Sequence, residues 1–363
     1  MLRKENKGIT LVALVITIII LLILATISIQ SLTNTGLFEK AKEAKEKTAN
    51  ATENQAKTLN EYEDELNKYV SGTTGENLEK LADKVKVGDY VSYTPDELSN
   101  ESLTTLKTNL NTYSGNSSST ANPAIKRDDL NWRVLDIQIG QVRLISETPT
   151  TSKIELKGYN GYNNAVKLID DACSTLYTNS KLANKVQNLK IEDITKYMKT
   201  QPTEDTTPYS PTNKYYPEIL LKEKGQTLNE TVGTELGVSE QTEFINQTTK
   251  PQVNSWTLKK TCWSQSMNNT DSFTDSKYYE LFINNGSNYP IYWIASRCID
   301  SDTRNSFFDI HFVNSGNVRI CTLYSTTNSE STSSYNFRPV ITLNPNVQVT
   351  SGNGTEEQAY LIK

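Results

Sequence analysis

The feature that most constrains this chain is an apolar run close to its start. No charged residue occurs in the 21 positions from Ile9 to Ile29. As a helix, this run would be about 32 Å long at roughly 1.5 Å per residue, which is enough to cross the hydrocarbon of a bilayer. A cleavable secretory signal has a shorter apolar core followed by small residues, and Ala25-Thr26-Ile27 matches such a site poorly. We therefore expect a transmembrane helix over residues 9–29.

The charges that flank this run predict how the chain is oriented. Arg3, Lys4 and Lys7 precede it. By the positive-inside rule, they keep the N-terminus cytoplasmic and place the C-terminal bulk of the chain outside the cell. We expect a single-pass protein of the cell membrane, in contact with membrane lipid. The 37 basic and 42 acidic residues of the whole chain nearly balance, so no nucleic-acid partner is predicted.

The residues around Gly8 resemble a known processing motif. Met1 to Gly8 form a short basic leader that ends in Gly, and the apolar run begins directly after it at Ile9. This arrangement resembles the prepilin-type cleavage and methylation motif of type IV pilins and type II secretion pseudopilins, in the subgroup found in Gram-positive bacteria. The resemblance implies that a prepilin peptidase cuts after Gly8 and methylates Ile9. It also implies a leader over 1–8, and an assembly helix over 9–29 that packs with other pilin-like subunits in a surface filament.

The expected assembly helix departs from the family at two positions. Ile9 stands where the family usually has Phe, and Ala13 stands where it has a Glu that pairs with the N-terminal amine of a neighbouring subunit. An unpaired carboxylate is costly in hydrocarbon, which gives that pair a physical role. Thr10 and Thr17 can hydrogen-bond back to their own helix. Because of Ala13, a membrane-anchored binding protein that is never processed remains the alternative.

Residues 30–72 carry charges of both signs. Small or apolar residues recur every three or four positions between residues 38 and 69, a spacing typical of an amphipathic helix. Two interpretations stay open. The segment is a solvated stalk, or it is the second half of a long first helix that packs on a globular domain through Tyr62, Leu66 and Tyr69. The Gly-containing residues 71–75 predict the end of this helix.

The remaining chain, residues 80–363, is dominated by short β-type runs. Asn131–Ile137 and Gln141–Ser146 lie on either side of a short turn and predict a hairpin. Leu103–Asn122 is polar and rich in Ser, Thr and Asn, so we expect a loop there. The interpretation is an extracellular α+β domain that is rich in strands.

Two helices are expected inside this domain. Gly161–Tyr177 places its apolar residues on one helical face, and Cys173 lies among them, which favours a core position over a reactive thiol. Ile191–Met198 predicts a shorter helix. The four cysteines of the chain form no CxxC pair, and they allow three disulfide pairings in an exported protein, with buried free thiols as an equal alternative. They are Cys173, Cys262, Cys298 and Cys321.

The C-terminal third carries a second resemblance. It contains YYELFINNGSNYPIYWIASRCID, NSFFDIHFVNSGNVRICTLY and YNFRPVITLN. The order of these motifs resembles a family of exported bacterial domains of unknown function, which look like the C-type-lectin-like fold in the branch of the formylglycine-generating enzymes. The resemblance implies a β-rich lectin-like domain over residues 80–363. The residues expected to hold this fold are Trp132, Trp293, Arg297 and Arg338, with a buried salt bridge as the expected partner of each arginine.

No catalytic site is predicted. The only histidine is His311, no nucleophile motif accompanies it, and there is neither a glycine-rich phosphate loop nor a Cys/His cluster with zinc spacing. We therefore expect no enzyme activity, no cofactor and no metal. His311 alternates with Phe308, Ile310 and Phe312, which predicts a surface or binding-face position. The candidate ligand-binding surface consists of Asp302, Arg304, Asn305, Asp309, His311, Asn314, Arg319 and Tyr324.

Together these patterns predict a pilin-like cell-surface subunit, a pseudopilin or minor pilin. Its N-terminal helix would anchor it, and its lectin-like domain would bind or adhere to an unidentified extracellular ligand.

Overall fold

The computed structural model describes residues 78–116, 122, 124–200, 202, 215–217, 239–245, 253–255, 265–267, 270–283, 290–301, 306–325 and 329–363. The expected leader, assembly helix and stalk lie outside these residues, and so do Gly8, Ile9, Thr10, Ala13 and Thr17. The chain divides into two units, Met1–Gly75 and Glu76–Lys363. We call the second unit the head. Within the part of the head that is described, no helix is long and apolar enough to cross a membrane.

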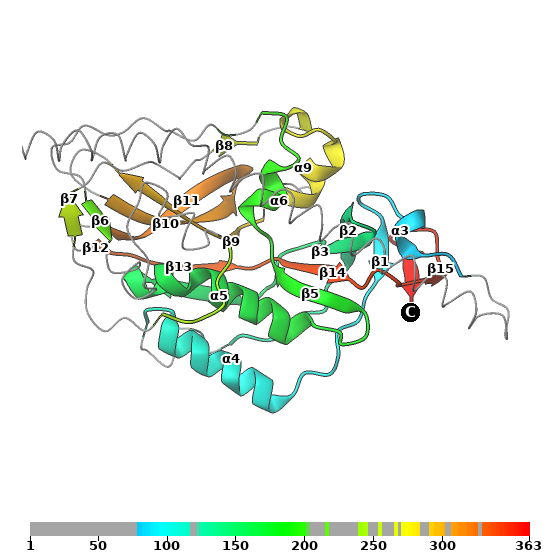
Figure 1. Cartoon of the computed structure of the whole chain (residues 1–363), viewed down its shortest axis with the longest axis horizontal. Coiled ribbons are helices and arrows are strands. Elements are labelled where there is room, and N and C mark those ends of the chain that lie inside the picture. Colours follow the sequence, from blue (N-terminus) through cyan, green and yellow to red (C-terminus); the bar gives the residue numbers. More distant parts are fainter. Residues whose placement is uncertain are drawn as a thin grey trace, which may run out of the picture. The chain divides into compact units, whose positions relative to one another are not determined.

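The first sheet of the head has the strand order β15-β16-β1-β2-β3-β14-β5 (Figure 1). Its neighbouring strands are antiparallel, except for the parallel pair β1 and β16. The strands are β1 (Tyr90–Ser92), β2 (Trp132–Gln138), β3 (Gln141–Ser146), β5 (Ala183–Asn188), β14 (Pro339–Leu343), β15 (Val349–Ser351) and β16 (Tyr360–Ile362).

The expected hairpin is confirmed as β2 and β3. The two strands pair from Trp132 with Ser146 to Gln138 with Gln141. The turn residues Ile139 and Gly140 both have positive φ, 51° and 73°. A two-residue hairpin turn with both φ values positive matches the right-handed twist of the strands, and Gly adopts that conformation readily.

The second sheet has the order β12-β11-β10-β9-β13-β4, and β8 pairs with β11 beside it. Strands β9, β10 and β11 follow one another as antiparallel neighbours, while β13 lies parallel to β9. The bounds are β4 (Lys153–Lys157), β8 (Gln265–Ser266), β9 (Tyr292–Ser301), β10 (Ser306–Asn314), β11 (Asn317–Ser325), β12 (Ser329–Glu330) and β13 (Thr332–Asn336). A separate pair is formed by β6 (Tyr215–Pro217) and β7 (Val253–Ser255).

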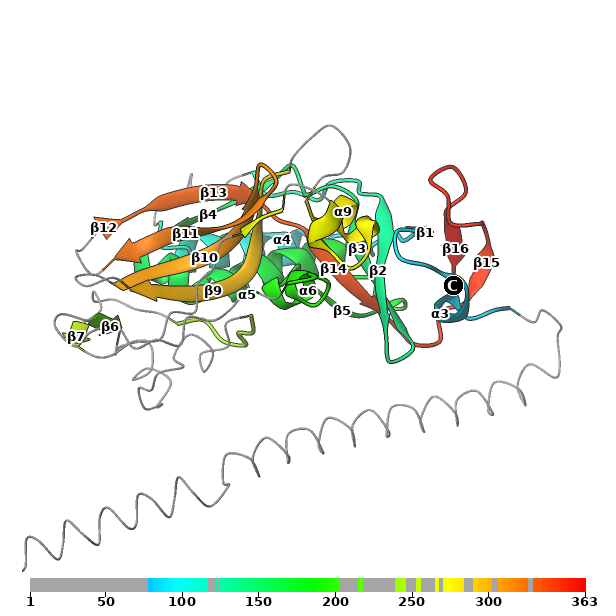
Figure 2. The same cartoon turned by 90° about the horizontal axis from the view of Figure 1, so that it is seen from above.

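Two residues connect the two sheets. Strand β13 ends at Asn336 in the second sheet, and β14 begins at Pro339 in the first sheet. Only Phe337 and Arg338 lie between them, and both are buried. The chain therefore passes from one sheet directly into the other, as the continuous orange path from β13 to β14 in Figure 2 shows.

Helix α5 is the main helical element and confirms the expected amphipathic helix. It spans Gly158–Tyr177, three residues longer at its start than predicted. The expected apolar face is buried, with Leu168, Ile169 and Cys173 fully inaccessible. This face packs on the second sheet, mainly on β9, and on β5 of the first sheet. The other helices are α3 (Leu81–Lys84), α4 (Asn100–Tyr113), α6 (Ile191–Thr195), α9 (Ser276–Phe282) and the 3-10 turn η1 (Thr270–Ser272).

Helix α4 corrects the prediction of a loop over Leu103–Asn122. Ser99 caps its N-terminus, because its hydroxyl accepts a hydrogen bond from the Ser102 N–H at 3.1 Å. Leu106 and Leu110, four positions apart, are buried against the core. The threonines that suggested a loop bond instead to the carbonyl four residues earlier, as Thr104 does at 2.7 Å. The polar composition of this segment led to the prediction of a loop, although a helix with only a narrow apolar stripe can pack on the core.

Helix α6 is shorter than expected, ending at Thr195 rather than Met198. Met198 makes a β-bridge to Phe273 instead.

The core has two clusters of buried side chains. One joins α5 to the second sheet and to one face of the first sheet. The other joins α6 and α9 to the opposite faces, since β3 places Leu144 in the first cluster and Ile145 in the second. The head is therefore an α+β domain, rich in strands, whose central strands are covered on both sides.

Candidate functional site

The residues of the expected ligand-binding surface do not form one surface. Asp302, Arg304 and Asn305 lie outside the described residues, between β9 and β10. Three more are interior: Asp309, His311 and Tyr324 are each at most 1 % exposed. Asn314 is half-buried at the β10–β11 turn, and Arg319 is exposed.

The predicted surface position of His311 is wrong. Phe308, Ile310 and Phe312 face α5, yet Asp309 and His311 on the opposite face are buried as well. The reason is that β10 is a central strand whose two faces are both covered, so alternation along it does not separate core from solvent. Nδ1 of His311 lies 3.3 Å from the Ser296 carbonyl oxygen on the neighbouring strand β9.

Tyr324 is buried on the other face of the second sheet. Its ring lies 5.7 Å from the ring of Tyr159 on α5, edge to face, and 5.8 Å from that of Phe308. Such aromatic pairs contribute to packing rather than to a binding face. The position predicted for Tyr324 is therefore also wrong.

All four residues expected to hold the fold lie in the core. Trp293 is inaccessible, and its Nε1 donates to the Ile154 carbonyl at 2.8 Å, which connects β9 to β4. Trp132 is 3 % exposed and packs edge to face on Tyr177, with ring centroids 5.7 Å apart. Arg297 donates from Nη1 to the Asn163 carbonyl at 2.7 Å.

Arg338 corrects the expectation of a salt bridge. Its guanidinium donates to the Ser146 carbonyl, at 3.1 Å from Nε and 3.0 Å from Nη2, and to the Glu147 carbonyl at 2.8 Å. It also lies over the ring of Tyr292, 5.3 Å from the centroid. Burial lowers the pKa of Arg338, and the nearby Tyr292 opposes this shift. Carbonyl dipoles and an aromatic face thus take the place of a carboxylate, at the point where the two sheets meet.

A second buried arginine does have carboxylate partners. Arg143 on β3 donates to both oxygens of Asp136 on β2, at 2.7 and 2.6 Å, and from Nη1 to Asp193 on α6 at 2.5 Å. Tyr197 also donates to Asp136. Burial alone would raise the pKa of Asp136, but the hydrogen bonds and charge of Arg143 outweigh it and lower that pKa to about 2. This cluster, which we call the Arg143 network, fastens α6 to the first sheet.

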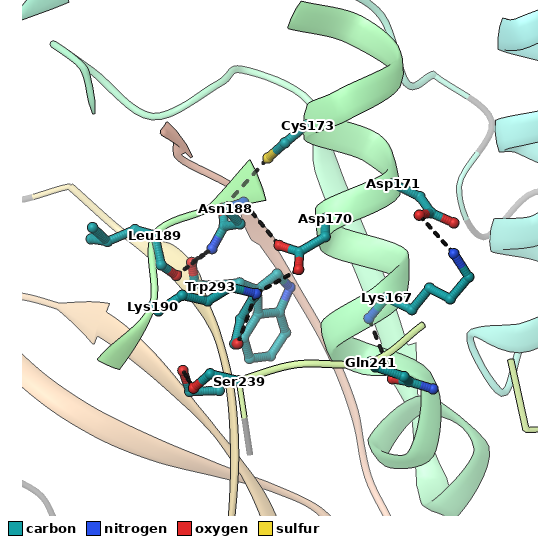
Figure 3. A network of polar contacts seen from close by, with 12 residues as sticks. Lys167, Asp170, Asp171, Cys173, Asn188, Leu189, Lys190, Ser239, Gln241 and Trp293 are labelled. Carbon is teal, nitrogen blue, oxygen red and sulfur yellow. Dashed lines mark hydrogen bonds and ion pairs between the residues drawn. The ribbon is translucent and has the colours of Figure 1, made fainter. Parts of the chain in front are cut away.

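A third polar cluster lies where α5 meets β5, as Figure 3 shows. The Asp170 carboxylate on α5 accepts from the Asn188 N–H at 2.9 Å and from Nζ of Lys190 at 2.5 Å. The side chain of Asn188 donates to the Trp293 carbonyl at 2.9 Å and accepts from the Arg338 N–H at 2.7 Å. Each polar group in this cluster bonds to another element of the fold, so we assign it a structural role.

The described cysteines are of two kinds, free thiols and a disulfide-bonded residue. Cys173 and Cys321 are free, while Cys298 is disulfide-bonded to a partner outside the described residues. Burial raises the pKa of the Cys173 thiol. A thiol that resists ionisation is a poor nucleophile, which agrees with its place in the core. Among the described residues, no group of three or more His, Cys, Asp or Glu side chains could hold a metal ion.

At the β4 edge of the second sheet, the described residues that bond to the strand are the Asn122 side chain and the Ser114 carbonyl rather than another strand. β4 pairs with β13 on one side only. On its open side, the Asn122 side chain accepts from the Glu155 N–H at 2.8 Å and donates to the Glu155 carbonyl at 3.4 Å. The Lys157 N–H donates to the Ser114 carbonyl at 2.8 Å. Gly115 permits this approach, because a Cβ there would lie 1.8 Å from the Lys157 carbonyl oxygen.

A cavity of about 320 Å³ opens beside this edge, at the start of β4. We call it the β4-edge cavity. Its volume is at the low end of the range for ligand pockets, about 300–1,000 Å³. It is lined by Asn122, Ala124, Lys126, Thr151, Ser152, Lys153 and Ser334.

The sequence did not indicate this cavity. Lys126 and Lys153 belong to separate polar segments, and no motif connects them. They lie at one site because Ser152, next to Lys153, accepts from the Lys126 N–H at 3.1 Å and donates to the Lys126 carbonyl at 3.2 Å. The site therefore arises from a tertiary contact between two loops.

No protein-family model, no curated protein and no solved structure matches this chain. Its function is therefore inferred from its own residues.

Proposed function

We propose that this chain is a pilin-like cell-surface subunit, a pseudopilin or minor pilin, that is anchored by its N-terminal helix and presents the head for binding or adhesion. The observation that carries the proposal is the basic leader ending at Gly8, followed directly by the uncharged run Ile9–Ile29. In this proposal, a prepilin peptidase cuts after Gly8 and methylates Ile9. The proposal assigns no catalytic step to the chain.

Two features of the head support an extracellular location. Cys298 is disulfide-bonded, and disulfides persist in oxidising environments outside the cytoplasm. The head is also a separate unit that begins at Glu76. A domain that packs within itself can be carried outside the membrane on a preceding helix.

A lectin-like fold of the head is part of the proposal. The motifs that suggested it contain Trp293, Arg297 and Arg338, and all three side chains are buried and hydrogen-bonded to the backbone of another segment. Buried side chains that connect one segment to another in this way suit a scaffold whose loops vary, as in binding domains. The β4-edge cavity is the binding site that the proposal offers on this scaffold.

Mass spectrometry of the intact protein and of its N-terminal peptide, purified from its native membrane, tests the proposal. We expect a chain that starts at N-methylated Ile9. A Gly8→Val variant is the matched control and is expected to keep Met1, because the cleavage site is removed. A wild-type chain that starts at Met1 would overturn the pilin assignment.

Ala13 favours a second candidate, a membrane-anchored binding protein that is not processed and joins no filament. The carboxylate that pairs with a neighbouring subunit in the family is missing at this position. The two candidates share the head and its binding role, and they differ in the N-terminus that the mass measurement reports.

A further inference from the structure

The β4-edge cavity is lined by two lysines that form no ion pair within the described part of the head. Lys126 and Lys153 both line it, and neither ammonium group has a carboxylate partner there. Two acidic side chains beside the cavity are hydrogen-bonded to neutral groups. Asp128 accepts from the N–H and the hydroxyl of Thr151, at 2.7 and 2.6 Å, and Glu155 accepts from the Asn116 amide.

The wall of the cavity is held in place by hydrogen bonds. Asn122 is 2 % exposed, and its amide bonds to the backbone of Glu155. Ser152 is 7 % exposed, and its hydroxyl bonds to the backbone of Lys126 on both sides. Lys153 belongs to β4, where it is in register with Asn336 of β13. A site whose backbone is fixed in advance loses less entropy when a ligand binds.

The chemistry of the lining selects the charge of the ligand. Sites for neutral sugars and other uncharged rings use apolar and aromatic surfaces, and none of the described residues that line this cavity is aromatic. Two ammonium groups instead attract an anion, and hydroxyl groups such as Ser334 can donate to its oxygens. The cavity is small, so it can hold a small molecule or a single unit of a polymer, but not a longer segment of that polymer.

We propose that the β4-edge cavity binds a carboxylate or phosphate group, carried by a single acidic unit of an extracellular polymer or by a small acidic molecule. Lys126 and Lys153 supply the charge that attracts the group, while the hydroxyl groups and the amide of the wall orient it. This inference rests on the proposed binding function of the head and specifies its ligand.

Binding of matched small probes tests the inference. Titration calorimetry of the detergent-solubilised full chain would compare galacturonate with galactose, and glycerol 3-phosphate with glycerol. We expect the acidic member of at least one pair to bind, the neutral member not to bind, and the affinity to fall with added salt. Comparing the two pairs distinguishes a carboxylate ligand from a phosphate ligand. Failure of both acids to bind at millimolar concentration would overturn the inference.

Variants of the two lysines assign the binding to this cavity. Lys126→Gln and Lys153→Gln should each weaken binding of the acidic probe about tenfold, the usual effect of removing one charge-assisted hydrogen bond. Lys107→Gln on α4 removes the same charge away from the cavity and should leave the affinity unchanged. An equal loss in all three variants would mean that surface lysines in general, and not the cavity, attract the anion, and would overturn the inference.

A panel of immobilised neutral and acidic polysaccharides separates failure of this inference from failure of the proposed function. Binding of the full chain to acidic polysaccharides, lost in Lys126→Gln/Lys153→Gln, supports both. Binding to neutral polysaccharides that the double variant retains would keep the binding role of the head and overturn the anion site. Absence of binding to every polysaccharide, together with no binding of the small acids, would overturn both.

Discussion

The Arg143 network and the β4-edge cavity differ in whether a positive side chain is buried and paired with carboxylates. In the network, one guanidinium contacts two carboxylates at 2.5 to 2.7 Å, and its side chain is 8 % exposed. In the cavity, Lys126 and Lys153 are exposed and have no carboxylate partner in the described part of the head. A buried charge must be compensated within the chain, whereas an exposed one is stabilised by water and remains available. The comparison indicates that polar clusters of the interior hold the fold, whereas the lysines at the open edge stay available for the anion that we propose.

Arg338 adds a third arrangement, in which a buried cation has no carboxylate partner among the residues that the structure describes. Its donors point at the carbonyls of Ser146 and Glu147. Hydrogen bonds to a charged group contribute about 1.5–3 kcal/mol each, so correctly oriented carbonyls can stabilise a buried guanidinium. The difference from Arg143 is that no anion would be left behind if Arg338 were removed.

The comparison is tested most strongly by Arg143→Leu. This change leaves the buried Asp193 without Arg143, and it leaves Asp136 with Lys196, 3.4 Å away, as its remaining cation among the described residues. It should lower the free energy of unfolding by about 3 kcal/mol at neutral pH. Urea unfolding of the detergent-solubilised chain measures it. Arg319→Leu at an exposed position is the control, expected within about 0.5 kcal/mol of wild type. A loss below about 1 kcal/mol for Arg143→Leu would show that the network does not stabilise the head.

The pH dependence of the same network is the next largest effect. The folded pKa of Asp136 is about 2, below its ordinary value of 3.8. A lowered pKa stabilises the fold above the unfolded value, so the contribution is complete above about pH 4 and is lost as the pH falls through about 2. At about 1.4 kcal/mol for each unit, it amounts to roughly 2 kcal/mol.

Unfolding of the wild type and of Asp136→Asn between pH 2 and pH 6 measures this contribution. We expect the wild type to be the more stable by about 2 kcal/mol near pH 6 and the difference to shrink toward pH 2. Asp83→Asn, at an exposed position on α3, is the control. A difference that stays constant over the whole pH range would contradict the assignment.

Asn122 is predicted to have a smaller effect, because it closes the sheet edge beside the cavity. Asn122→Ala removes the two hydrogen bonds to the backbone of Glu155 and should cost about 1–2 kcal/mol of stability. Hydrogen exchange provides a local readout, since the Glu155 N–H loses its acceptor and should exchange faster. Unchanged exchange at Glu155 would mean that Asn122 does not protect the edge.

The smallest effect on stability is expected for the double variant Lys126→Gln/Lys153→Gln. Neither lysine has an ion pair to lose, so the free energy of unfolding should stay within about 0.5 kcal/mol of wild type. Combined with a loss of anion binding, this result would separate the cavity from the Arg143 network. A destabilisation above about 1 kcal/mol would show that the lysines serve the fold instead.

Local patterns in the sequence were sufficient for several elements of the head. Two β-type runs on either side of the Gly140 turn predicted β2 and β3, and the spacing of apolar residues in Gly161–Tyr177 predicted α5. These features depend on the period of a single helix or strand and on turn chemistry, which a short stretch of chain contains in full. Helix α4 was missed because its cap and its back-bonding threonines have the composition of a loop.

Other properties were decided only by the tertiary structure. Whether His311 is exposed depends on what covers the second face of β10, and that is not visible in the alternation of its own strand. Whether Arg338 needs a carboxylate depends on the direction of the carbonyls of Ser146 and Glu147. The cavity requires Lys126 and Lys153 to lie on one wall, and the two bonds of Ser152 accomplish this. The sequence by itself determined the periodic elements, because periodicity is local, while burial and binding chemistry arose from contacts between segments that are distant along the chain.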